Sequence, residues 1–449
     1  MSGRSGRAGW RRMMARGSGA RRLIGGASAT TGMKLVSMGL RFAATICLTR
    51  LLGVENYGVY AFVFTLMTVL GEPVFGGLRT LMLRNTAQLK ARDDWPGLAG
   101  LRQSMGRITL GATLGVGLLL PLIGLAMEGG ARGPTFVACV AAAPLPILLG
   151  LMRHSEGALI GQGHVIAGQI PKLLLRPLLT LAVLGGWLWA AAPLNAAGAL
   201  WLLGATALLG LIAYRVADRR YRPPQLQGVA PRHDTRRWLS GGLPLMISAG
   251  FYIVEHQGAV LVIGALADAR TTGLFHAAMR LAELTGLVYA SANIVLQPRV
   301  ARLHARGEMR RLQRLIGLST LAMCGVTAAI AAGIWLWGDI LLRLFGTEFT
   351  EAHGALAVMA GGVVLSVALG PSTMILPMTD RAGDAARGVI LGAIVNVGLS
   401  AALVPHYGLM GAAAAQPAAV LTAKSYLAWR VRRGTGIDPT LLGGLRLLH

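Results

Sequence analysis

Basic side chains inside long apolar runs are the residues of this sequence best suited to chemistry. An Arg or Lys that faces lipid at the centre of a bilayer costs on the order of 3 kcal/mol, so such residues should face a polar interior or reach an interface. Arg can hold a phosphate with two parallel hydrogen bonds, so a cavity lined by these residues would suit an anionic ligand. The candidates for anion binding are Arg41, Arg79, Lys172, Arg176 and Arg280.

The spacing of the basic residues predicts that they share helix faces. Lys34 and Arg41 are seven residues apart, close to two helical turns, and Lys172 and Arg176 are four apart. Each pair would therefore point to one side of its helix and line a common interior. The alternative for the lysines, including Lys424, is that their ammonium groups extend to the nearer membrane interface.

Fewer acidic groups lie in the apolar runs, and these could bind a coupling ion. The candidates for protonation or sodium binding are Glu72, Glu255 with its neighbour His256, and Glu283. Two alternatives require no bound ion. Arg280 and Glu283, three residues apart, could neutralise each other, and Glu255 with His256 could be a buried hydrogen-bonded pair.

No enzyme or metal motif accompanies these residues. The stretch 161–168 (GQGHVIAG) lacks the spacing of a dinucleotide-binding loop, and the sequence contains no Walker loop. The histidines lack metal-ligand spacing, and Cys47, Cys139 and Cys324 lie in apolar runs, where buried thiols are expected. The sequence therefore predicts a protein that is not an enzyme, with no metal and no cofactor.

Twelve apolar runs must position the polar residues. Of the 449 residues, 54% are hydrophobic and 14% charged, and the mean hydropathy is +0.58. A soluble protein carries about 25% charged residues, and a spanning helix needs about 20 apolar residues, so the composition predicts an all-α polytopic membrane protein. The predicted spans are 31–52, 57–83, 108–127, 134–152, 166–190, 196–216, 239–266, 271–296, 315–337, 352–369, 388–404 and 409–428.

The net charge of +25 reflects membrane topology rather than nucleic-acid binding, because the basic residues cluster in short segments between the apolar runs. Most of the 43 Lys and Arg residues fall in alternate segments that begin with the N-terminal tail, which predicts that both termini are cytoplasmic. The expected layout is a basic, disordered tail (1–22) that touches anionic lipid headgroups, a six-helix lobe (23–216), a cytoplasmic linker (217–237), a second six-helix lobe (238–431) and a cytoplasmic tail (432–449).

A weak internal repeat relates the two lobes. An offset of 215 residues places 51–62 over 266–277 and pairs Gly58 with Gly273. The same offset places Arg41 over His256, so both lobes would carry polar groups at matching depth. Two related lobes around a site near the membrane midplane are typical of secondary transporters.

Three stretches resemble bacterial polysaccharide flippases of the multidrug, oligosaccharidyl-lipid and polysaccharide exporter superfamily. They are TRLLGVENYGVYAFVFTL (49–66), LLRLFGTEFTEAHGALAVMA (341–360) and LVPHYGLMGAAAAQ (403–416), which follow the first, ninth and eleventh predicted spans. The resemblance implies a V-shaped pair of six-helix lobes around a central cavity, in the inner membrane of a bacterium. It also implies that the basic candidates bind the anionic cargo.

The cargo implied by the resemblance is a polyprenyl-pyrophosphate-linked oligosaccharide or polysaccharide repeat unit, flipped by alternating access. Membrane lipids, a glycan polymerase and other polysaccharide assembly proteins are the expected partners. The main alternative is a cation-coupled multidrug exporter of the same superfamily, for which an acidic cavity would be expected. A non-transporting scaffold of a polysaccharide synthase is a third possibility, and it would need no charges on interior helix faces.

Overall fold

The described part of the chain is helical. The computed structural model describes residues 5–128, 130, 133–190 and 192–446, and no strand occurs among them. Within these residues, nine helical segments are long and apolar enough to cross a membrane. These findings confirm the prediction of an all-α polytopic membrane protein.

The nine long segments agree approximately with the twelve predicted spans. Two of the nine contain a break and so each account for two spans, and a pair of shorter helices that is not among the nine accounts for one more. Gly53 divides the segment Gly32–Ala91 and Gly408 divides Ala382–Thr435, each with a positive φ that only glycine adopts readily. The pair α10 and α11 meets at Gly286 and supplies the remaining crossing. The breaks therefore account for the difference in number.

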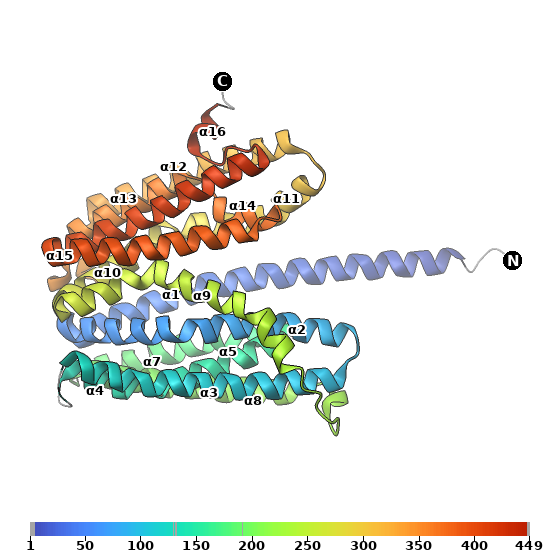
Figure 1. The fold of residues 1–449 in the computed structure, drawn as a ribbon, viewed down its shortest axis with the longest axis horizontal. Helices are drawn as coiled ribbons and strands as arrows, with labels where there is room; N and C mark the ends of the chain where they lie inside the picture. The colour runs from blue at the N-terminus through green and yellow to red at the C-terminus, as the bar shows by residue number, and fades with distance from the viewer. Residues whose placement is uncertain (1–4, 129, 131–132, 191, 447–449) are drawn as a thin grey trace.

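The first half of the chain forms one group of helices, which we call the N-terminal lobe (Figure 1). Its elements are α1 (Ser5–Glu72), the π-helical segment η1 (Pro73–Leu78), α2 (Arg79–Ala91), α3 (Trp95–Glu128), α4 (Pro134–Ala142), α5 (Leu145–Gly161), α6 (Val165–Ile170), the π-helical segment η2 (Pro171–Leu175), α7 (Arg176–Trp189) and α8 (Ala196–Tyr221). The tail expected to be disordered is instead helical from Ser5 onward, as part of α1, and residues 1–4 lie outside the described residues.

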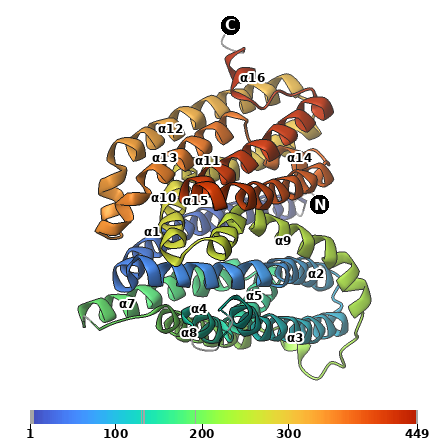
Figure 2. The ribbon, with the colours of Figure 1, turned by 60° about the vertical axis from the view of Figure 1, so that its left-hand side comes forward.

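The second half forms the C-terminal lobe, which Figure 2 shows above the N-terminal one. A 3₁₀ turn η3 (Pro224–Leu226) and α9 (Thr235–Leu266) lead into it. The remaining elements are α10 (Ala269–Thr285), α11 (Leu287–Ala305), α12 (Met309–Arg343), the 3₁₀ segment η4 (Thr347–Ala352), α13 (His353–Ala368), α14 (Ser372–Met378), α15 (Ala382–Thr435) and α16 (Leu441–Leu445).

Capping side chains fix where several helices begin. The side chain of Asn195 accepts a hydrogen bond from the backbone N–H of Gly198 at the start of α8, and Asp268 accepts one from Thr271 at the start of α10. Exposed apolar side chains cover the outer faces, among them Leu118, Leu122, Ile212 and Ile394. This pattern is typical of helices whose outer faces contact lipid.

Helix α9 packs on both lobes. In its first half Gly242 lies against Leu81 and Met246 against Gly77, both of the N-terminal lobe. In its second half Gly258 lies beside Val397 of α15. The helix therefore passes from one lobe to the other, as the views also show (Figures 1 and 2).

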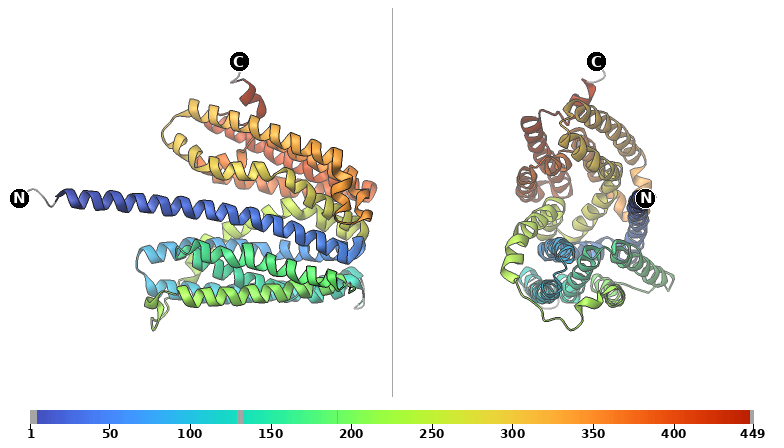
Figure 3. Two further views of the ribbon diagram at one scale, coloured as in Figure 1. Left: turned by 180° about the vertical axis from the view of Figure 1, so that it is seen from behind. Right: turned by 90° about the vertical axis from the view of Figure 1, so that its right-hand side faces the viewer.

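The lobes converge at one end of the molecule and diverge toward the end from which the N-terminal part of α1 extends (Figure 3). At the convergent end, which we call the closed end, Arg50 Nε donates to the Leu344 carbonyl at 2.8 Å and the Val54 N–H donates to Glu348 at 3.4 Å. These bonds join α1 to the segment around η4 across the two lobes.

Two glycines allow the closest approach of the backbones at the closed end. A Cβ on Gly58 would overlap the carbonyl oxygen of Ala269, and a Cβ on Gly273 would overlap that of Val54. The contact is reciprocal, because an offset of 215 residues relates Gly58 to Gly273 and Val54 to Ala269. Such a reciprocal contact is expected if a two-fold axis relates the lobes and if the offset of 215 residues, proposed from the sequence, is correct.

We expect Gly58→Ala to destabilise the closed end, because the added methyl group has no space against Ala269 and overpacking costs about 1–3 kcal/mol. The apparent unfolding temperature of the purified protein in detergent should fall by several degrees. Gly111→Ala is the matched control, since a Cβ on this glycine of α3 would meet no atom within 4 Å. Equal unfolding temperatures for the two variants would contradict the proposed close contact.

Candidate functional site

A cavity of about 760 Å³ lies between the lobes. Side chains from α1, η1, α5, η2, α7, α8, α9 and α10 line it. Among the described residues, six lining side chains are basic and three are acidic, so the lining carries an excess of positive charge. The basic ones are Lys34, Arg41, Arg153, Lys172, Arg176 and Arg280, and the acidic ones are Glu72, Glu156 and Glu283.

Proline starts the two π-helical segments that lead to the basic residues of the N-terminal lobe. Pro73 begins η1, and Arg79 follows its last residue. Pro171 begins η2, which contains Lys172 and ends before Arg176, whose backbone N–H bonds to the Pro171 carbonyl five residues back. The wider turn changes the direction of the side chains that follow it, and such insertions recur at functional sites.

Glu156 holds three cations together. Its carboxylate lies 2.9 Å from an Arg79 nitrogen, 3.5 Å from Arg153 and 3.5 Å from Lys172, and its side chain is only 3% exposed. Each partner is a quarter or more exposed. A buried carboxylate with several cationic partners has its charge compensated. Glu156 therefore organises this side of the cavity.

The sequence alone did not identify this cluster. It suggested Arg79 and Lys172 as independent anion-binding groups, whereas both contact Glu156. Lys172 lines the cavity, and Arg79 is not among the lining residues. Arg153 was not predicted. Its position three residues before Glu156, on the same face of a helix, was the available signal.

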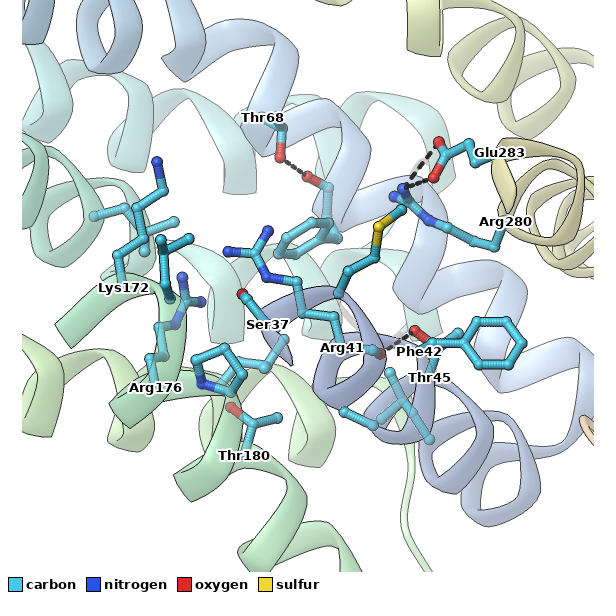
Figure 4. Close-up of a pocket in the computed structure, with 18 of the residues that line it drawn as sticks. Ser37, Arg41, Phe42, Thr45, Thr68, Lys172, Arg176, Thr180, Arg280 and Glu283 are labelled. Carbon is cyan, nitrogen blue, oxygen red and sulfur yellow. Dashed lines mark hydrogen bonds and ion pairs between the residues drawn. The ribbon is translucent and has the colours of Figure 1, made fainter. Parts of the chain in front are cut away.

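Arg41 and Arg176 have a different status, since within the described residues neither guanidinium makes a hydrogen bond or ion pair. Both line the cavity. Figure 4 shows the Arg41 guanidinium between Lys172 and Arg176 on one side and Arg280 on the other. Two guanidinium groups, one from α1 and one from α7, have no protein carboxylate to neutralise them, so together they are complementary to a phosphate or pyrophosphate.

Arg280 is paired. Its Nη1 lies 3.1 Å from both carboxylate oxygens of Glu283, and the pair lines the cavity on the C-terminal side (Figure 4). The structure thus contains the mutual neutralisation that the three-residue spacing allowed. Arg280 Nη2 also lies 3.2 Å from Nε2 of His276, a residue that sequence reasoning did not single out.

The other acidic candidates lie in two different parts of the structure. Glu72 lines the cavity, whereas Glu255 and His256 do not. Glu255 lies between α9 and α15, where its backbone carbonyl accepts a hydrogen bond from the Asn396 amide at 2.5 Å. His256 Nδ1 bonds to the Tyr252 carbonyl at 2.9 Å and lies 3.9 Å from the Glu255 carboxylate.

Lys424 also lies away from the cavity lining. Its ammonium group donates to the Ser366 carbonyl at 3.1 Å and lies 4.2 Å from the centre of the Tyr289 ring. These contacts satisfy the charge inside the C-terminal lobe. The groups that could hold an anion are therefore those of α1, η2, α7 and α10.

Comparison with known proteins places this geometry in a known fold. The chain superimposes on an inward-facing multidrug resistance MATE family transporter of the MOP superfamily with a TM-score of 0.75, at 15% identity, over 92% of this chain and 95% of that one. It matches the lipid II flippase MurJ in an inward closed conformation with a TM-score of 0.68, at 13% identity, over 91% and 87%. The chain has the fold of the MOP superfamily transporters.

A curated relative shares part of the sequence of this MOP-fold chain. A probable low-salt glycan biosynthesis flippase, Agl15 of Haloferax volcanii, is 26% identical over 160 residues. The match spans 35% of this chain and 33% of that relative, so only about a third of either protein is covered. No protein-family model matches the chain.

We expect Glu156→Gln to lower the free energy of unfolding by on the order of 3 kcal/mol, because three cations lose a shared, buried counter-charge. Thermal unfolding in detergent measures the change. Glu308→Gln is the control, since Glu308 pairs with the well-exposed Arg311 and such surface pairs contribute at most about 1 kcal/mol. A loss no greater than the control's would show that Glu156 does not organise the cluster.

Proposed function

We propose that the protein is a flippase that moves a lipid-linked glycan with a pyrophosphate group across the cytoplasmic membrane. One observation carries the proposal: Arg41 and Arg176 present guanidinium groups to a cavity with excess positive charge, and neither has an anionic partner within the described residues. The fold of the MOP transporters and the partial similarity to a glycan flippase support the same conclusion.

In the proposed mechanism, the charged headgroup and glycan enter between the diverging ends of the lobes while the lipid tail stays in the bilayer. Arg41, Lys172, Arg176 and Arg280 replace water around the phosphates, which lowers the cost of moving them through the membrane. Arg79 acts through Glu156, by holding it in place beside Lys172. The lobes then rock about the bound headgroup and open at the opposite end.

Two further parts of the proposal concern orientation and energy. The diverging end faces the cytoplasm, because the basic segments between helices lie on the side of the N-terminus. Both chain termini then lie in the cytoplasm. Glu72 and Glu283 in the cavity, and Glu255 with His256 in the C-terminal lobe, are the groups at which an ion would reset the cycle.

Drug export is less consistent with the charges of the cavity. A pump for cationic drugs needs uncompensated carboxylates, whereas two of the three acidic side chains that line the cavity, Glu156 and Glu283, already contact cations. A scaffold without transport activity would not need a hollow with basic side chains. The cavity therefore favours an anionic cargo.

We expect Arg41→Ala and Arg176→Ala each to reduce flipping of a polyprenyl-pyrophosphate glycan by about tenfold or more in reconstituted vesicles. The loss of a charge-assisted hydrogen bond is worth about 1.5–3 kcal/mol, and 1.4 kcal/mol corresponds to a tenfold change. The rate at which externally accessible glycan appears, measured with a sugar-specific probe, gives the readout.

Arg343→Ala serves as the control, because Arg343 is an exposed cation at the end of α12 that does not line the cavity. Protein amount and monodispersity should be the same for all three variants. Flipping by Arg41→Ala and Arg176→Ala at the rate of Arg343→Ala would overturn the proposal. Export of a cationic dye without glycan transport would favour drug export instead.

A further inference from the structure

A hydrogen bond between two buried side chains joins the lobes at the closed end. Tyr57 Oη lies 2.7 Å from Nδ1 of His276, and the ring centres are 5.4 Å apart. Tyr57 belongs to α1, just after the break at Gly53, and His276 belongs to α10. Both side chains are almost fully buried. Because they come from different lobes, this bond must break when the closed end opens.

The second nitrogen of the same imidazole faces the cavity. His276 Nε2 lies 3.2 Å from Nη2 of Arg280. A guanidinium has donors only, so Nε2 must accept this bond, and Nδ1 then carries the proton and donates to Tyr57. The three side chains thus connect a cation of the cavity to the contact that closes the opposite end.

Arg280 is placed to respond to a ligand. Its side chain is 26% exposed and lines the cavity, and two of its five N–H groups suffice for Glu283. A phosphate carries a full negative charge, so it attracts the guanidinium more strongly than a neutral imidazole does. If Arg280 turns to a phosphate, one ring nitrogen of His276 is left buried without a hydrogen-bond partner, whichever tautomer the ring adopts. The unpaired nitrogen raises the free energy of the closed arrangement until water can reach it.

We propose that His276 is a positioning residue that couples anion binding at Arg280 to release of the closed end. The inference rests on the proposed function, since it takes the anion to be the phosphate of the cargo. With the cavity empty, Arg280 satisfies His276 and the bond to Tyr57 keeps the lobes together. With an anion on Arg280, the closed arrangement loses a hydrogen bond and the open one is favoured.

The first experiment tests the bond between the lobes without any ligand. Spin labels at Trp189→Cys and Tyr407→Cys, exposed positions beside the closed end on opposite lobes, report opening as a longer distance in a background in which Cys47, Cys139 and Cys324 are replaced. Tyr57→Phe should increase the open fraction about fivefold, the value of one ordinary hydrogen bond.

Tyr60→Phe is the matched control for this measurement. Tyr60 lies one helical turn from Tyr57 and also lines the cavity, but its hydroxyl makes no hydrogen bond within the described residues. It should leave the distance distribution of the parent unchanged. Equal open fractions for Tyr57→Phe and Tyr60→Phe would overturn the role of the bond, whatever the protein transports.

The second experiment divides the two functions of the imidazole. An asparagine amide reaches the position of Nδ1, so His276→Asn keeps a donor for Tyr57 and loses the contact with Arg280. A glutamine amide reaches the position of Nε2, so His276→Gln keeps an acceptor for Arg280 and loses the bond to Tyr57. Without ligand, His276→Asn should stay closed like the parent, and His276→Gln should open like Tyr57→Phe.

Inorganic pyrophosphate then serves as the probe, with sodium chloride at equal ionic strength as the control. The parent should shift toward the longer distance with pyrophosphate, and His276→Asn should not. A shift of His276→Asn equal to that of the parent, or no shift of the parent, would overturn the coupling. If the shifts occur as expected but vesicles flip no glycan, the coupling stands and the proposed cargo fails.

Discussion

The cost of an unpaired charge away from water governs the arrangement of this protein. Glu156 is almost completely buried, and three cations from α2, α5 and η2 gather around it. Removing one partner from such a group leaves a charge that neither lipid nor protein can compensate. The N-terminal lobe therefore has a fixed ionic centre. Beside it Lys34, Arg41 and Arg176 line the cavity without an ion pair among the described residues.

Packing at the closed end complements this ionic centre. Gly58 and Gly273 bring two helices into backbone contact. The bond between Tyr57 and His276 lies beside this contact, since Tyr57 precedes Gly58 and His276 comes three residues after Gly273. Around it Tyr57 also contacts the ring of Phe349, with centres 5.9 Å apart. Among the described residues three hydrogen bonds cross this end, and only the one between Tyr57 and His276 is fully buried. The two more exposed bonds can be replaced by water, so the end can separate without leaving many polar groups unpaired.

Much of the fold could be predicted from the sequence, because the lengths of the apolar runs and the glycines that interrupt them are visible in short stretches of the chain. The turn around Gly53 and the pairing of Gly58 with Gly273 were both expected, and both occur. The site was less predictable. Arg79 and Glu156 are far apart in sequence, and a single sequence contains no information on such distances. The π-helical segment η2 contains Lys172 and ends just before Arg176, so the ordinary α-helical spacing was an unreliable guide to the directions of these two side chains.

Helix α9 shows why the two lobes are not separable units, although the expected boundary at residue 238 lies near its start. Its first half packs beside Leu81 and its second half packs on α15. A fragment that ended at residue 237 would expose the apolar surface around Leu81. A fragment that began there would contain the first half of α9 without the N-terminal lobe on which it packs. Any rocking of one lobe against the other must also bend α9 itself. Pro244, which removes one backbone donor within the helix, makes that bending less costly.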